Sequence, residues 1–164
     1  MYFKSTLSMV FAVGVFIVSP VYAETDAQLF KKGQWRDPAT GLEWMRCSIG
    51  QTWTGTSCDG EGKRMNWNDA MKAGNDLSYG GVTGWRLPTF DELKTIIVIE
   101  GKADNASAFI FKPTSDYWGE YWSSSPMADV FYHALIINFD HNAIGTYRKD
   151  TNCYVRLVRT GQQE

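Results

Sequence analysis

The chain has 164 residues, of which 44% are hydrophobic and 15% are aromatic. Its 16 basic and 18 acidic residues give a formal charge of −2. This balance argues against a nucleic-acid-binding protein, because such proteins carry a basic surplus or a basic stripe. The length suits one domain with its own hydrophobic core.

Residues 1–23 have the order of a secretory signal peptide. Lys4 gives a positive start, residues 9–18 form an apolar run, and residues 21–23 end in a small residue, Ala23. A membrane-spanning helix needs roughly 20 apolar residues, which is longer than this run. We therefore expect cleavage after Ala23 and a periplasmic or secreted mature protein without a membrane span.

Three cysteines follow the signal peptide, and an oxidising compartment favours disulfides. Cys47 and Cys58 flank a loop rich in Gly, Thr and Ser, so we expect them to pair. A zinc site is the alternative, although no Cys or His pair has the spacing of zinc ligands. Cys153 lies in an alternating, strand-like run, which favours a buried free thiol. A bond between chains, or pairing with one of the other two cysteines, is the competing interpretation.

The first predicted elements are a hairpin and a helix. Residues 24–34 form a polar lead-in to a domain that we place over residues 35–160, followed by a tail over residues 161–164. Turn residues between aromatic and aliphatic flanks predict a β-hairpin over residues 35–44. Apolar residues at helical spacing, after Asn66 as N-cap, predict the first helix.

A second helix and a group of strands complete the domain. Thr89 and Glu92 have the spacing of a capping box, and Gly101 ends the helix that they start. Residues 101–120 show no periodic pattern of apolar residues, which predicts a long loop. Short strand-like runs follow, with a hairpin tip at residues 140–142; these runs are residues 121–125, 131–139, 143–148 and 154–158. Helices followed by strands predict an α+β domain.

Six blocks of sequence follow one another along the chain: residues 37–45, the Cys-bounded loop, and residues 67–70, 84–89, 121–124 and 154–159. In this order they resemble the Lcl C-terminal domain family, bacterial surface and secreted domains named after a collagen-like adhesin. Some of the blocks also resemble the formylglycine-generating-enzyme type of C-type-lectin-like fold. The resemblance implies two helices, a small twisted antiparallel sheet with long loops, and termini close together.

The residues give no recognisable catalytic set. The cysteine pair of formylglycine-generating enzymes has no counterpart, because the downstream region offers only Cys153. His133 lies in an alternating strand and His141 in a turn, which indicates structural or merely exposed roles. We therefore predict no enzyme activity and no cofactor. Asp140, Asn142 and Asp150 carry oxygens that calcium favours, but turn formation explains them, and we predict no metal.

The blocks also contain residues with structural interpretations. Arg86 and Arg156 lie in strongly patterned runs, where they can anchor backbone carbonyls or a carboxylate such as Glu92. We expect the tryptophans of the blocks, which are Trp67, Trp85 and Trp122, to lie in the core.

We predict ligand contacts in two places. Tyr117, Trp118 and Tyr121 cluster in and after the long loop, where aromatic rings can stack on sugars or grip a protein. Packing of Trp118 onto its own loop is the competing interpretation. Arg148 and Lys149, at the end of a strand, can meet an anion such as a sulfated glycan or a carboxylate.

The leading hypothesis is an exported, non-catalytic recognition domain that binds a glycan or a protein, in adhesion or in a surface assembly. An enzyme or an enzyme-inhibitory protein with a polar site in the loop face is the alternative. A purely structural subunit is the third hypothesis. The sequence does not predict the oligomeric state.

Overall fold

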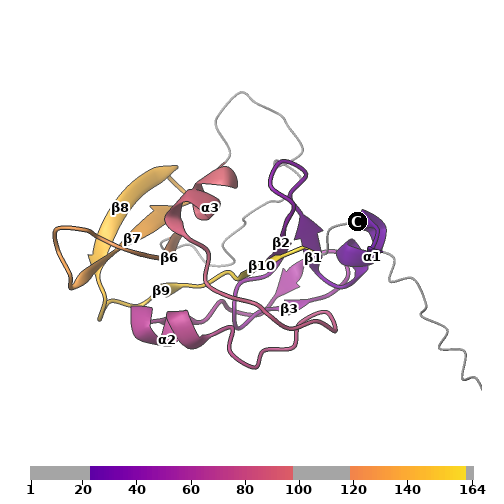
Figure 1. The fold of residues 1–164 in the computed structure, drawn as a ribbon. Helices are drawn as coiled ribbons and strands as arrows, with labels where there is room; N and C mark the ends of the chain where they lie inside the picture. The colour runs from indigo at the N-terminus through magenta and orange to yellow at the C-terminus, as the bar shows by residue number, and fades with distance from the viewer. Residues whose placement is uncertain (1–22, 98–118, 162–164) are drawn as a thin grey trace, which may run out of the picture.

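The structure is a computed structural model that describes residues 23–97 and 119–161 (Figure 1). The predicted signal peptide up to residue 22, most of the predicted long loop, and the predicted ligand residues Tyr117 and Trp118 lie outside the described residues. The described elements are α1 (Asp26–Lys31), β1 (Gln34–Arg36), β2 (Leu42–Met45), β3 (Thr52–Trp53), β4 (Cys58–Asp59), β5 (Arg64–Met65), α2 (Trp67–Lys72), α3 (Phe90–Thr95), β6 (Glu120–Pro126), β7 (His133–Asn138), β8 (Ala143–Arg148), β9 (Cys153–Tyr154) and β10 (Val158–Thr160).

These elements form a small α+β domain that is mostly sheet, as predicted. The largest sheet has the order β5-β9-β6-β7-β8, and a second sheet has the order β1-β2-β10. The predicted N-terminal hairpin is confirmed by the pairing of β1 with β2, in which Trp35 lies opposite Trp44. Because β10 pairs with the other edge of β2, the beginning and the end of the domain lie side by side (Figure 1).

The large sheet packs between two helices, and alternate residues of its strands face opposite ways. Trp122 and Ile136 lie in one hydrophobic cluster with Ala70 of α2. Tyr121 and Ile137, one position along, lie in the other cluster, which contains Leu93 of α3 and its C-cap residue Ile96. In Figure 1, α2 and α3 accordingly lie on opposite sides of β9. The predicted core positions of Trp85 and Trp122 are confirmed, and Trp67 is partly buried against the first cluster.

Each of the two predicted helices begins directly after its predicted N-cap residue. Asn66 accepts a hydrogen bond from the Asp69 N–H at the start of α2, and Thr89 forms the predicted capping box with Glu92 at the start of α3. The structure has a third helix besides the two that the sequence predicts, because α1 lies within the predicted lead-in over residues 24–34. Its cap is a further capping box between Thr25 and Gln28.

The patterned arginines have the predicted structural contacts. Both terminal nitrogens of Arg86 donate to the Glu92 carboxylate, at 2.7 and 2.6 Å. Arg156 is fully buried and donates to the carbonyl oxygens of Met45 and Arg46. Burial lowers the pKa of Arg156, and these carbonyl groups compensate for part of the water that its guanidinium has lost.

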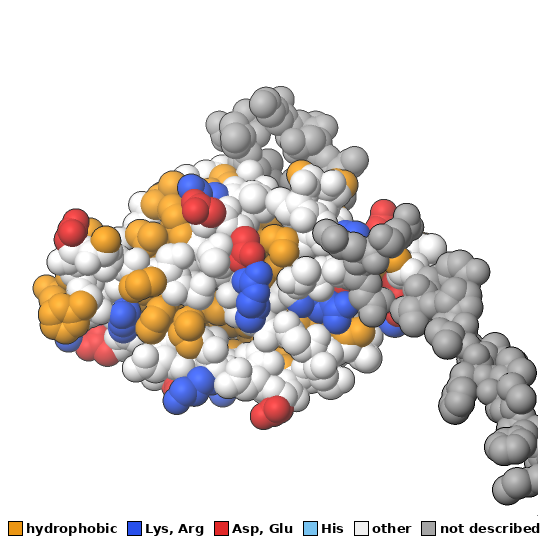
Figure 2. Space-filling view, in the orientation of Figure 1, with side chains coloured by type: hydrophobic (Ala, Val, Ile, Leu, Met, Phe, Trp, Pro, Cys, Tyr) orange, Lys and Arg blue, Asp and Glu red, His pale blue; other side chains and the backbone are white. Residues whose placement is uncertain are grey.

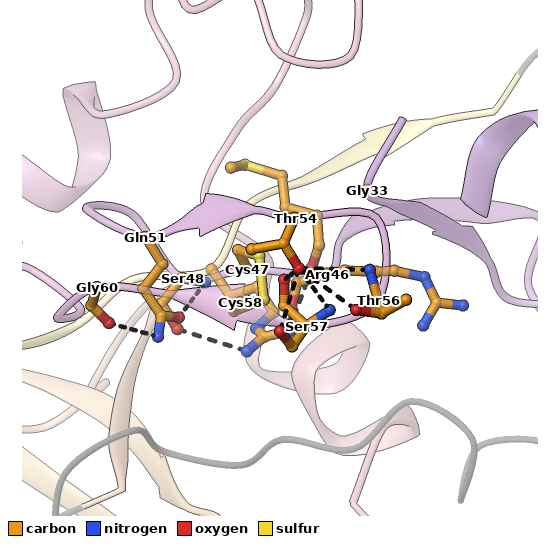
Figure 3. Close-up of a disulfide and its surroundings, with 12 residues drawn as sticks. Gly33, Arg46, Cys47, Ser48, Gln51, Thr54, Thr56, Ser57, Cys58 and Gly60 are labelled. Atoms are coloured by element: carbon orange, nitrogen blue, oxygen red, sulfur yellow. Dashed lines mark hydrogen bonds between the residues drawn. A yellow bond between two sulfur atoms is a disulfide. The ribbon is translucent and has the colours of Figure 1, made fainter. Parts of the chain in front are cut away.

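The predicted disulfide between Cys47 and Cys58 is confirmed, with Cα atoms 5.4 Å apart (Figure 3). It closes a loop that contains β3 and ends at the first residue of β4. Within this loop the Thr54 hydroxyl donates to the Ser57 carbonyl oxygen and accepts from the Ser57 N–H. Cys153 is a buried free thiol, as predicted.

Candidate functional site

A shallow hollow of about 610 Å³ lies between the N-terminus of α2 and the open end of the β7–β8 hairpin. Figure 2 shows hydrophobic, basic and acidic side chains gathered at the end of the molecule where β6 connects to β7 in Figure 1. The residues that line this first hollow are Asn66, Asn68, Asp69, Phe131, Tyr132, Arg148, Lys149 and Asp150.

The main chain of Lys149 connects the β7–β8 hairpin to α2 through hydrogen bonds. Its N–H donates to the Tyr132 carbonyl oxygen at 2.8 Å, which closes the open end of the β7–β8 ladder. Its own carbonyl oxygen accepts from the Trp67 N–H at 2.9 Å, at the first residue of α2. These two bonds set the position of the hollow's two walls relative to each other.

Two adjacent aromatic side chains, just before β7, line the side of the hollow that the β7–β8 hairpin forms. Phe131 is 82% exposed and Tyr132 is 50% exposed. Their rings meet edge to face at 5.3 Å, and the Arg148 guanidinium lies 5.9 Å from the centre of the Tyr132 ring. Exposed rings held in this way offer apolar faces to a ligand and lose little conformational freedom on binding. In the sequence this aromatic doublet falls within the predicted strand over residues 131–139, and nothing there indicates that both rings are exposed.

The charged groups of the hollow are held by neighbours. Arg148 donates to both carboxylate oxygens of Asp150, at 3.1 and 2.8 Å, which raises the pKa of Arg148 and lowers that of Asp150. The Lys149 ammonium donates to the Phe131 carbonyl oxygen at 2.7 Å and lies 4.3 Å from the Trp67 ring centre. With Asp69, the hollow carries two basic and two acidic groups.

A second hollow of about 450 Å³ continues along α2 and shares Asn66 and Asp69 with the first. Its lining residues are Ile49, Lys63, Arg64, Met65, Asn66, Asp69, Lys72, Ala73 and Asn152. Arg64 has a carboxylate partner in Glu120, 3.7 Å away, whereas no ion pair among the described residues includes Lys63 or Lys72. We call the two hollows together the α2 groove.

The structure brings together only part of the predicted ligand set. Arg148 and Lys149 both line the α2 groove. Tyr121 is 2% exposed, and its hydroxyl lies 2.7 Å from the Ser48 hydroxyl oxygen. Its ring packs against Phe139 and Tyr154, because β6 is an inner strand with both faces covered. The ring of Tyr121 therefore has no open face for a ligand.

The oxygen-bearing residues considered for calcium do not meet. Asn142 precedes β8 and Asp150 follows it, so the strand separates them. The Asp140 carboxylate accepts from the Gly119 N–H at 2.8 Å. Within residues 23–97 and 119–161, no group of three His, Cys, Asp or Glu side chains is arranged to hold a metal ion. In the same part of the chain, no helix is both long enough and apolar enough to cross a membrane.

Fold and site together define a small, disulfide-bonded α+β domain with a surface groove lined by exposed aromatic and charged side chains. Residues 33–159 match the sequence profile of the Lcl C-terminal domain family. The chain therefore belongs to this family, as its sequence blocks indicated. No curated protein sequence matches the chain.

Proposed function

We propose that this protein is an exported, non-catalytic recognition domain that binds an acidic polysaccharide in the α2 groove. The observation that carries the proposal is the exposed pair Phe131 and Tyr132 at one end of a groove whose other end holds Lys63 and Lys72. Sugar rings have apolar faces that suit aromatic side chains. Acidic substituents further along the glycan suit the ammonium groups of Lys63 and Lys72, which form no ion pair with any residue in the described ranges.

Charge supports an acidic rather than a neutral glycan. The α2 groove as a whole is lined by five basic residues, namely Lys63, Arg64, Lys72, Arg148 and Lys149, and by two acidic residues, Asp69 and Asp150. The first hollow alone is balanced, so the basic surplus comes from the second. Clefts lined by one sign of charge concentrate ligands of the opposite sign.

The predicted signal peptide and the disulfide support export to the periplasm or the cell exterior. We also propose that the domain has the C-type-lectin-like fold. The twisted sheet between two helices and the adjacent domain ends are consistent with that fold.

A glycan array with the mature protein tests the proposal, followed by titration of the best acidic oligosaccharide. We expect Phe131→Ala/Tyr132→Ala to weaken binding at least about tenfold, because truncation of a central aromatic contact commonly has this effect. Lys63→Gln/Lys72→Gln should weaken binding and reduce its salt dependence.

Matched controls lie outside the groove. Phe30→Ala removes another exposed aromatic ring, and Lys31→Gln removes another exposed ammonium group. Both should leave the affinity unchanged. Equal affinity of the wild type for the acidic oligosaccharide and its neutralised form would contradict the proposal, as would turnover of the bound glycan.

A further inference from the structure

The strand β8 forms one edge of the large sheet. Its partner on the inner side is β7, with which it pairs in unbroken register from His133 opposite Arg148 to Asn138 opposite Ala143. Of the described elements, none pairs with the outer side of β8. In Figure 1 the strand lies at the margin of the molecule, away from β1, β2 and β10.

The ladder defines which backbone groups point outward. Lys149 donates to Tyr132, so this opposite pair is a hydrogen-bonded one. In an antiparallel ladder every second pair is hydrogen-bonded, and the residues between them direct their N–H and C=O groups to the other side. Ile144 and Thr146 therefore present both groups outward, and Arg148 presents its N–H. The Arg148 carbonyl oxygen already accepts from the Thr151 N–H.

Most of this edge lacks the usual protection against pairing, because the last residue, Arg148, is the only charged residue of β8. Natural edge strands carry inward charges, prolines or bulges that prevent contact with another chain. Residues 143–147 are Ala, Ile, Gly, Thr and Tyr, without charge or proline, and their register with β7 has no bulge. Ile144 is also 58% exposed, one of the most exposed large hydrophobic side chains among the described residues.

The charges at the two ends of β8 favour one relative direction. Arg148, Lys149 and Asp150 stand at its end, which keeps a basic surplus although Arg148 pairs with Asp150, and Asp140 stands in the turn before its start. Two parallel β8 strands would place basic residues beside basic residues. Two antiparallel strands place the basic end of each beside the acidic turn of the other, and opposite charges across a strand pair are stabilising.

We propose that β8 pairs antiparallel with β8 of a second copy, about a two-fold axis at Ile144. In this register Ile144 lies opposite Ile144 of the other copy, so the two exposed side chains shield each other from water in part. Arg148 lies opposite Asp140 of the other copy. The interface is isologous and closes as a dimer. Each α2 groove stays on its own copy, with Arg148 at the border between groove and interface. If the α2 groove binds a glycan as proposed, the dimer presents two ligand sites and binds a repetitive ligand with greater avidity.

Sedimentation equilibrium of the mature protein, over roughly 1 µM to 1 mM, tests the pairing. We expect a reversible dimer, and we expect Ile144→Lys to weaken it at least tenfold, because the substitution puts two like charges on the axis. The melting temperature of the dilute monomer should stay unchanged, since the Ile144 side chain is mostly exposed. Met71→Lys is the matched control: it replaces a 42% exposed apolar side chain of α2, outside β8, and should leave association unchanged.

Disulfide trapping tests the register. Cysteines at the axis have Cα atoms within bonding range, whereas residues two positions away from the axis do not face their own copies. Ile144→Cys should therefore form a disulfide-linked dimer on mild oxidation, and Thr146→Cys should not. A wild-type monomer at all concentrations would overturn the proposal, as would a dimer that Ile144→Lys leaves intact or efficient trapping through Thr146→Cys.

Discussion

Buried polar residues illustrate how single side chains adapt to this core. Arg156 keeps its charge by donating to carbonyl oxygens of the chain, and its guanidinium also lies 5.8 Å from the Tyr121 ring centre. Cys153 has adapted in the opposite way, because a thiol can remain neutral when it is buried. Burial is the main reason why the pKa of Cys153 rises to about 12.

This raised pKa predicts an unreactive thiol. The thiolate is the nucleophilic form, and at pH 8 a group with a pKa of about 12 is almost entirely protonated. We expect iodoacetamide to leave the native protein unmodified and to label one cysteine per chain after denaturation without reductant. Mass spectrometry of both samples checks this. Rapid labelling of Cys153 in the native state would show that the residue is accessible.

Helix α3 shows how a short helix is stabilised at its first turn. Glu92 has two roles: its carboxylate accepts from the Thr89 N–H at 2.8 Å and from the Arg86 guanidinium. The bond to Arg86 is the largest cause of the lowered pKa of Glu92, followed in the same direction by the Thr89 backbone. The helix is only six residues long, so these contacts matter more than its intrinsic propensity.

The lowered pKa predicts how this stabilisation depends on pH. A carboxylate with a lower pKa in the folded than in the unfolded state stabilises the fold above its ordinary value of about 4.5, and this contribution is lost as the pH falls below it. Glu92→Gln should destabilise the protein by about 1 kcal/mol at pH 7 and flatten the acid limb of its stability curve.

Thermal unfolding between about pH 7 and pH 3 measures this effect. Asp91→Asn is the control, because Asp91 forms an exposed ion pair with Lys94 in the same helix, and such pairs contribute little. If both variants show the same pH dependence as the wild type, the contacts of Glu92 do not stabilise the folded state.

The disulfide constrains a loop that has little regular secondary structure of its own. β3 and β4 are two residues each, and they pair only with each other. Cys47→Ala/Cys58→Ala should lower the free energy of unfolding by about 3 kcal/mol, because the unfolded chain regains the entropy of an open loop. Urea denaturation measures the loss. An unchanged midpoint would mean that contacts within the loop suffice.

Local features of the sequence were sufficient to predict several elements. The cap of α3, the turn of the β1–β2 hairpin and the pairing of Cys47 with Cys58 depend on residues close together in the chain. Asn142 has a positive φ of 49° at the predicted hairpin tip, a conformation that Asn tolerates. By the same reasoning, Thr25 and Gln28 could have predicted α1, whose capping box has the same spacing as that of α3.

Other features were decided by tertiary structure. In the sequence, Tyr121 belongs to a cluster of aromatic residues that predicts a ligand contact. It is buried because its strand, β6, lies between β9 and β7 in the large sheet. The run at residues 154–158 reads as one strand, but it is divided between β9 and β10, which belong to different sheets.

The family, the α+β class, the disulfide and the basic pair Arg148 and Lys149 could therefore all be predicted from the sequence. The tertiary structure decided that this pair shares a groove with Phe131, Tyr132 and the start of α2, and that β8 is an edge. Caps, turns and alternation arise between residues a few positions apart. The groove depends on the contact of Trp67 with Lys149, which are far apart in the chain, and the edge depends on the order of all five strands in the large sheet.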